Sequence, residues 1–156
     1  MSRSRAPRRA RPLLPQDPNL GVLLFIPSRS MEVRILAAVN EAGHDVTMAQ
    51  SKVFQRIGPD GSRLTDLAAA AEVTKQSAAF IVDQLVAKGY VERVPDPSDA
   101  RARLIRLTAL GHEVVEVARP VQQQIEAEWV EHLGAQRARE LYETLVELRK
   151  ITDPFA

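Results

Sequence analysis

The sequence predicts a mostly α-helical fold with one small β-ribbon, an α+β class, and three observations support this prediction. Hydrophobic residues make up 45% of the 156 residues but aromatic residues only 4%, so aliphatic side chains must build the core, which suits packed helices. Helix caps followed by apolar residues at helical spacing recur along the chain. Two runs with branched residues flank the polar segment "DPSDARAR" and predict the ribbon. The length fits one domain.

The chain begins with a basic arm. Its first twelve residues hold five arginines and no acidic residue, so the other residues carry 16 basic and 20 acidic side chains. We expect residues 1–15 to be disordered, and the arm either tracks a nucleic-acid groove through its charge or is a solvated tail. The arginines of the arm are Arg3, Arg5, Arg8, Arg9 and Arg11.

Neither export nor membrane insertion is expected. The apolar run "LGVLLFI" is short, ends at Pro27, and is separated from the arginines by "LLPQDPN". The chain contains no cysteine, which excludes disulfides, thiolate metal sites and cysteine nucleophiles. These features predict a cytoplasmic protein that makes no contact with a membrane.

The first helix is expected between residues 18 and 43. Asp17 is a suitable N-cap, and Pro18 suits the first helical position. Gly43 is expected to end the helix. Pro27 is expected to kink or interrupt it, because proline lacks the N–H group that a helix interior needs.

Three further helices are expected before residue 90. Thr47 and Gln50 form a capping box that begins a helix to about Ile57, where "GPDG" forces a turn, and the alanine-rich "RLTDLAAAAE" is helical. The helix "TKQSAAFIVDQLVAK" has Thr74 as its N-cap and Gly89 just past its end. Helical periodicity assigns to its core stripe Ala78, Ile81, Val82 and Leu85. The side chains that point the other way are Lys75, Gln76, Ala79, Phe80, Asp83 and Ala87.

The ribbon and two more helices complete the chain. The runs "YVERVP" and "LIRLT" predict two strands, and "DPSDARAR" a charged loop between them; such a hairpin must lean on helices to be stable. Thr108 is the expected N-cap of a long helix that Pro120 should bend or break. A last helix ends at Asp153-Pro154. Its narrow apolar seam consists of Ala138, Leu141, Leu145 and Leu148.

From about Thr47 to Gly111 the chain resembles the MarR-type transcription regulators. The resemblance rests on "LTDLAAAAEVTKQSAAFIVDQLVAKGYVER" followed by the wing "VPDPSDARARLIRLT". It implies a winged helix-turn-helix, with residues 47–110 as a DNA-binding lobe inside a single domain of residues 16–156. Residues 18–43 and 111–152 would then be dimerisation helices.

The resemblance implies that the helix after Thr74 reads double-stranded DNA in the major groove. Its first turn carries Thr74, Lys75, Gln76 and Ser77, whose polar groups and free backbone N–H groups can meet bases or phosphates. Ala79 and Phe80 stand where the family commonly has polar or basic residues. For Phe80 two roles stay open, contact with a thymine methyl group and packing against the wing, and we favour packing.

The wing is expected to lie over the neighbouring minor groove. Arg101 and Arg103 would enter the groove or clasp phosphates, and Asp99 would pair with Arg101 and fix its direction. Ala100 stands where the family often has another arginine. Arg63 either reaches phosphate or lies beside Asp66 or another acid.

A homodimer is expected, because one reading helix contacts too few base pairs to select a genomic site. The predicted interface consists of Leu23, Phe25, Leu141, Leu145 and Leu148. Many MarR-type regulators bind small anionic aromatic or lipophilic effectors between the dimer helices and the DNA-binding lobe. The sequence assigns neither an effector nor its pocket, and the residues considered for one are Arg34, His44, Phe54, Arg56 and His112.

No enzyme activity, cofactor or metal site is expected. The run "HEVVE" lacks the second histidine of a zinc motif. Glu128 and His132 lie one helical turn apart, but the chain has only three histidines. The sequence therefore favours a dimeric repressor that binds an inverted repeat and is released by a small molecule. The alternative is a winged-helix module that binds a protein through the face of Phe80, because a fold alone does not determine function.

Overall fold

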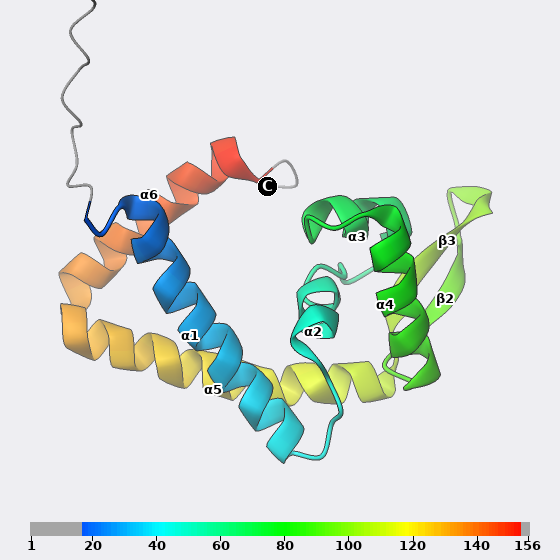
Figure 1. Ribbon diagram of the computed structural model, residues 1–156, viewed down its shortest axis with the longest axis horizontal. Helices are drawn as coiled ribbons and strands as arrows, with labels where there is room; N and C mark the ends of the chain where they lie inside the picture. The colour runs from blue at the N-terminus through cyan, green and yellow to red at the C-terminus, as the bar shows by residue number, and fades with distance from the viewer. Residues whose placement is uncertain (1–16, 154–156) are drawn as a thin grey trace, which may run out of the picture.

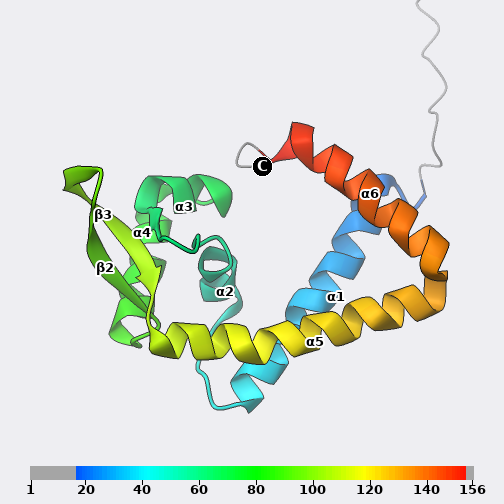
Figure 2. The ribbon, with the colours of Figure 1, turned by 180° about the vertical axis from the view of Figure 1, so that it is seen from behind.

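The computed structural model describes residues 17–153 and confirms a mostly helical fold with a small antiparallel sheet. Helix α1 crosses α5, and α6 folds back from the end of α5 (Figure 1). Helices α2, α3 and α4 and the sheet form a lobe at the other end of α5, and Figure 2 shows the same arrangement from behind. The elements are α1 (Leu20–Glu41), α2 (Met48–Phe54), β1 (Ser62–Arg63), α3 (Leu64–Ala70), α4 (Lys75–Ala87), β2 (Val91–Asp96), β3 (Asp99–Leu107), α5 (Ala109–Leu133) and α6 (Ala135–Thr152).

The sheet has the strand order β1-β3-β2, with both pairs antiparallel. Strand β1 was not predicted, because two residues are too short to show an alternating pattern. The segment predicted as a charged loop is mostly strand. Strand β3 already begins at Asp99 and pairs Arg103 with Pro95, so Arg101 and Arg103 are strand residues and only the turn around Pro97-Ser98 remains at the tip.

The core lies mainly inside the lobe, where α2, α3 and α4 pack on one another and α3 and α4 pack on the sheet, and it extends to Val39 of α1 and Val114 of α5. The predicted stripe of α4 is confirmed. Ala78, Val82 and Leu85 are fully buried, and Ile81 packs against the core from a partly buried position. Ile105, near the end of β3, is buried in the same cluster. Helix α4 therefore presents its opposite side to solvent.

The helix caps formed by threonine are confirmed. Each threonine hydroxyl accepts a hydrogen bond from a backbone N–H three residues later: Thr47 from Gln50, Thr74 from Ser77 and Thr108 from Gly111. The glycines expected after two helices are confirmed as well. Gly43 has a φ of 97° and Gly89 a φ of 79°, a region that non-glycine residues rarely adopt.

Some predicted helix limits are wrong. Helix α1 begins at Leu20 and not at Pro18, because the side chain of Asn19 accepts the hydrogen bond from Val22 N at 3.0 Å and caps the helix there. Pro27 does not interrupt α1, and Pro120 does not break α5. Each proline removes one N–H group, and the remaining hydrogen bonds keep both helices continuous.

Helix α2 ends at Phe54, three residues before the predicted end. Arg56 N donates to Val53 O at 3.1 Å and Ile57 N to Phe54 O at 3.2 Å, so the chain tightens into three-residue turns. The hydroxyl of Ser62 then accepts from Gly58 N at 2.9 Å. This bond ties the loop after α2 to the first residue of β1.

No helix within residues 17–153 combines the length and the apolar character needed to span a membrane.

Candidate nucleic-acid interface

The first turn of α4 is exposed and organised around its cap. The hydroxyl of Thr74 accepts from Ser77 N at 3.1 Å and donates to the Ser77 hydroxyl at 2.8 Å. These bonds engage two of the hydroxyls that were expected to meet DNA, while Lys75 and Gln76 remain exposed beside them. The positive end of the helix dipole and the free N–H groups of this turn favour an anion such as phosphate.

Phe80 lies on the outward side of α4 and is 64% exposed. The prediction that it packs against the wing is therefore wrong. On the exposed side, Asp83 of α4 and Arg93 of β2 form an ion pair. Ala79 is half-buried beside Phe80. The exposed ridge of α4 therefore combines the amide of Gln76 with an aromatic ring one turn later.

Arg101 and Arg103 alternate with half-buried Ala102 on β3 and are both exposed, on one face of the wing. The predicted ion pair between Asp99 and Arg101 is not found. Asp99 Oδ1 accepts from the backbone N of Arg101 at 3.0 Å, while Oδ2 lies 4.0 Å from Arg63 Nη2. Asp99 thus holds the backbone of the wing. Within residues 17–153 neither wing arginine has an acidic partner, so both charges are available to a ligand.

The base of the wing is held by Arg63 and Asp96. Arg63 donates to Asp96 Oδ2 from Nε at 2.8 Å and from Nη2 at 2.6 Å. Asp96 Oδ1 accepts from Ser98 N at 2.8 Å and from Ser98 Oγ at 2.6 Å. Of the two roles left open for Arg63, the structure thus supports pairing with an acid, and the partner is Asp96 rather than Asp66. Asp96 is 6% exposed and lies at the irregularity between β2 and β3.

The hydrogen bonds from Ser98, and then that from Arg63, lower the pKa of Asp96 to about 2 from the usual 3.8. A lowered pKa stabilises the folded state above pH 3.8, and this stabilisation is lost as the pH falls toward 2. We expect Asp96→Asn to flatten the pH dependence of the free energy of unfolding between pH 4 and pH 2. Urea unfolding followed by circular dichroism at each pH measures this dependence. Asp60→Asn, at an exposed turn, is the control; equal slopes for wild type and Asp96→Asn contradict the prediction.

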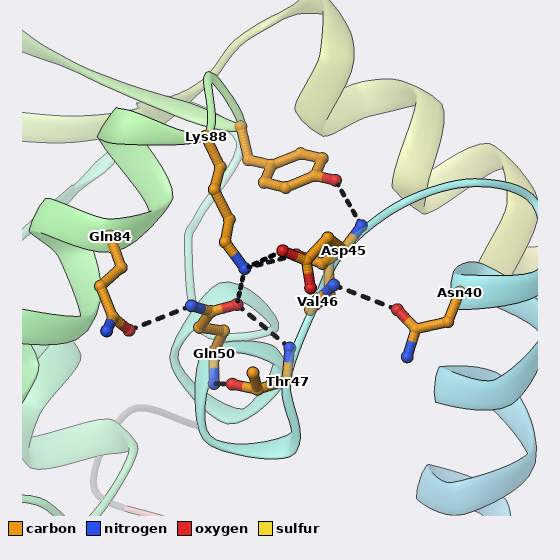
Figure 3. A network of polar contacts seen from close by, with 8 residues as sticks. Asn40, Asp45, Val46, Thr47, Gln50, Gln84 and Lys88 are labelled. Carbon is orange, nitrogen blue, oxygen red and sulfur yellow. Dashed lines mark hydrogen bonds and ion pairs between the residues drawn. The ribbon is translucent and has the colours of Figure 1, made fainter.

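A network of polar contacts attaches α4 to α2 and to the segment before α2 (Figure 3). Gln50 is 2% exposed and donates from Nε2 to Gln84 Oε1 at 3.0 Å, while its Oε1 accepts from Thr47 N at 3.1 Å and from Lys88 Nζ at 3.3 Å. Lys88 Nζ also donates to the Asp45 carbonyl and contacts the Asp45 carboxylate, both at 2.8 Å. The capping box predicted the local role of Gln50. Its link to Gln84 had no sequence signal, because the two residues are 34 positions apart.

A cavity of about 530 Å³ lies between α1, α2 and α5. Its apolar lining includes Leu36, Phe54 and Val114, and Glu32 and Arg119 add charged groups. Among the residues considered for an effector pocket, only Phe54 lines this cavity.

The other considered residues have different environments. Arg34 forms two hydrogen bonds with Glu128, at 2.6 and 2.8 Å, which lower the pKa of that carboxyl group. The His44 ring lies 5.8 Å from the Tyr90 ring. Arg56 lines a second, more polar cavity between the lobe and the end of α6, and His112 is an exposed residue of the first turn of α5. The five residues therefore do not form one pocket.

The predicted dimer residues lie on the surface of the single chain. Leu23, Phe25, Leu141 and Leu145 are between 39% and 64% exposed, and Leu148 is half-buried.

Residues 17–153 contain no group of three side chains that could together hold a metal ion. The arginines of the predicted arm, in residues 1–15, lie outside the described residues.

The fold and this surface define a class of protein. A capped helix α4 presents its first turn and outward ridge, and a two-stranded wing follows it, in which Arg101 and Arg103 have no acidic partner among the described residues; together they form a winged helix-turn-helix. The MarR family profile matches residues 56–102, from just after α2 into β3.

Comparisons with individual proteins agree with the match to the MarR family profile. The transcriptional regulator HosA from Escherichia coli O111:H- is 31% identical over 103 residues, which cover 65% of this chain and 76% of HosA. The apo structure of wild-type MarR from E. coli superposes with a TM-score of 0.66 at 26% identity, covering 83% of this chain and 96% of MarR. A MarR variant from E. coli in complex with operator DNA has a TM-score of 0.64 at 27% identity, covering 83% and 92%. The chain belongs to the MarR family of transcription regulators.

Proposed function

We propose that the protein is a homodimeric, sequence-specific DNA-binding repressor that recognises an inverted repeat and is released by a small lipophilic or aromatic effector. The observation that carries the proposal is the pair of exposed wing arginines, Arg101 and Arg103, which have no acidic partner within residues 17–153 and lie next to a reading helix with an exposed outward ridge. Relatives of this fold include a MarR variant in complex with operator DNA, which supports DNA as the partner.

Helix α4 places its first turn in the major groove, where each base pair has a distinct pattern of donors and acceptors. Gln76 reads base edges, and Lys75 contacts phosphate. Arg101 and Arg103 lie over the adjacent minor groove, where the negative potential attracts guanidinium groups. The ion pair of Arg63 with Asp96 holds the wing that carries these arginines. The basic arm supplies further sequence-independent affinity.

Two copies are needed for a specific site. The exposed apolar residues of α1 and α6, including Phe25 and Leu145, form the dimer contact. A two-fold dimer places two α4 helices about one turn of DNA apart and therefore selects an inverted repeat. A bound operator that overlaps a promoter produces repression.

The cavity between α1, α2 and α5 takes the effector. It contacts both the helices proposed for dimerisation and the lobe, and its lining is mainly aliphatic with Phe54. A ligand there releases DNA only if it binds the DNA-incompetent arrangement more tightly, so its affinity falls when the operator is bound.

Substitutions in the wing and in the reading helix test the DNA-binding function. We expect Arg101→Ala to weaken binding to all duplexes and to reduce the salt slope by about 1, because it removes one cation that displaces a counterion from the DNA. We expect Gln76→Ala to cost about 1–3 kcal/mol at the native site and to relax the choice of one base. Fluorescence anisotropy with the selected operator and a shuffled duplex, at two salt concentrations, measures both effects.

Arg139→Ala is the matched control, because it removes the same charge from an exposed position of α6 outside the proposed DNA surface. It should leave both readouts near the wild-type values. If Arg101→Ala and Gln76→Ala behave like this control, the DNA-binding function is rejected, and a module that binds a protein through the exposed ring of Phe80 replaces it.

A further inference from the structure

An aromatic ring is the largest exposed apolar group on α4. Phe80 is 64% exposed, on the side opposite the fully buried Ala78 and Val82. Gln76 precedes Phe80 by four residues and is also exposed, so the two side chains are neighbours on one ridge. Asp83, one turn later, is paired with Arg93. The part of the ridge that is not engaged in an ion pair therefore presents the amide of Gln76 and the ring of Phe80.

The charges around Phe80 favour DNA as the occupant of this ridge. Lys75 is exposed at the start of α4, and Arg101 and Arg103 are exposed on the adjacent wing. The nearest acid on the ridge, Asp83, is neutralised by its ion pair. A surface with an apolar centre, and at its margins cations that have no acidic partner in the described part of the chain, matches a major groove, where base edges lie between two phosphate backbones.

We propose that Phe80 determines specificity by packing on a thymine methyl group in each half-site, while Gln76 binds an adenine close by. This inference rests on the proposed DNA-binding function, and it specifies two of the bases that α4 would recognise in the operator. Thymine is the base that presents a methyl group in the major groove, and a glutamine amide matches the donor and acceptor of adenine. Four helical residues span about 6 Å, so the two bases lie within about two base steps of each other.

The test removes the methyl group without changing the hydrogen bonds of the base. Duplexes that bind the full chain are first selected from a random pool, and each thymine is then replaced singly with deoxyuridine. Fluorescence anisotropy at fixed salt gives the affinity of wild type and of Phe80→Ala for every duplex. For the contacted thymine we expect the dissociation constant of wild type to rise about fourfold, the value of one buried methyl group. Phe80→Ala should bind the thymine and deoxyuridine duplexes equally.

Two variants serve as controls. Phe80→Leu keeps an apolar contact and should retain part of the sensitivity to deoxyuridine. Arg101→Ala should weaken every duplex while the fourfold difference stays, because the wing arginine does not contact the methyl group. The ring of Phe80 is exposed, so Phe80→Ala should keep the circular dichroism spectrum and melting temperature of wild type.

The outcomes separate this inference from the proposed function. Selected duplexes that bind wild type specifically, with no thymine sensitive to deoxyuridine, overturn the inference alone. The same deoxyuridine loss in wild type and Phe80→Ala also overturns it, because another group then contacts the methyl. If no duplex from the pool binds better than a shuffled control, the proposed function fails, and a protein becomes the expected occupant of the ridge.

Discussion

Gly111→Ala is expected to destabilise the folded protein by about 3 kcal/mol or more, because the interior has no room for one added methyl group. A Cβ at this position would lie 2.2 Å from the Tyr90 carbonyl oxygen and 3.3 Å from Leu107 Cβ. The Tyr90 carbonyl cannot easily move. It accepts from Thr108 N at 3.1 Å and from the Thr108 hydroxyl at 3.2 Å, and these bonds join the end of the reading helix to the start of α5.

Urea unfolding followed by circular dichroism measures this loss. The control is Ala109→Gly, which changes an exposed residue in the same first turn of α5 and should cost only about 1 kcal/mol through helix propensity. A Gly111→Ala variant as stable as wild type would mean that α5 can move away from Tyr90, which contradicts the close packing of these two segments.

Leu145→Glu is expected to convert the proposed dimer into a monomer and to weaken operator binding by about 100-fold or more. The side chain is 39% exposed in the single chain, so the substitution leaves the lobe intact. In the proposed interface it would bury a carboxylate without a partner, twice in a symmetric dimer. The remaining half-site contact approaches non-specific affinity, which is typically at least about 10³-fold weaker than specific binding.

Sedimentation equilibrium and anisotropy with the selected operator measure the two effects together. A monomer should sediment with a mass of 17.3 kDa. The control is Gln136→Glu, which makes the same change of charge on the polar side of α6 and should leave both mass and affinity unchanged. If Leu145→Glu sediments as a dimer with wild-type affinity, the interface does not include this seam.

Local signals predicted the elements that position the interface. The caps at Thr74 and Thr108 were predicted correctly because each hydroxyl binds an N–H group only three residues away. The buried stripe of α4 followed from helical periodicity alone. Where a stronger local signal competed, the prediction failed: Asn19, and not Asp17, caps α1.

Hydrogen bonds and ion pairs between side chains that are distant in the sequence could not be predicted. Asp99 was expected to pair with Arg101, yet it holds the backbone N–H of that residue, and Arg63 pairs with Asp96 from 33 residues away. The exposure of Phe80 also required the fold, because periodicity places the ring opposite the core but does not show whether the wing covers it.

The sequence by itself determined the helices, their threonine caps, the ribbon and the resemblance to the MarR family, because each of these depends on residues that are close in the chain. The tertiary structure decided which charges are paired, which are available to DNA, and where the cavity lies. The physical reason is that ion pairs and burial depend on which elements lie side by side. Arg63 reaches Asp96 only because β1 and β2 flank β3 in one sheet.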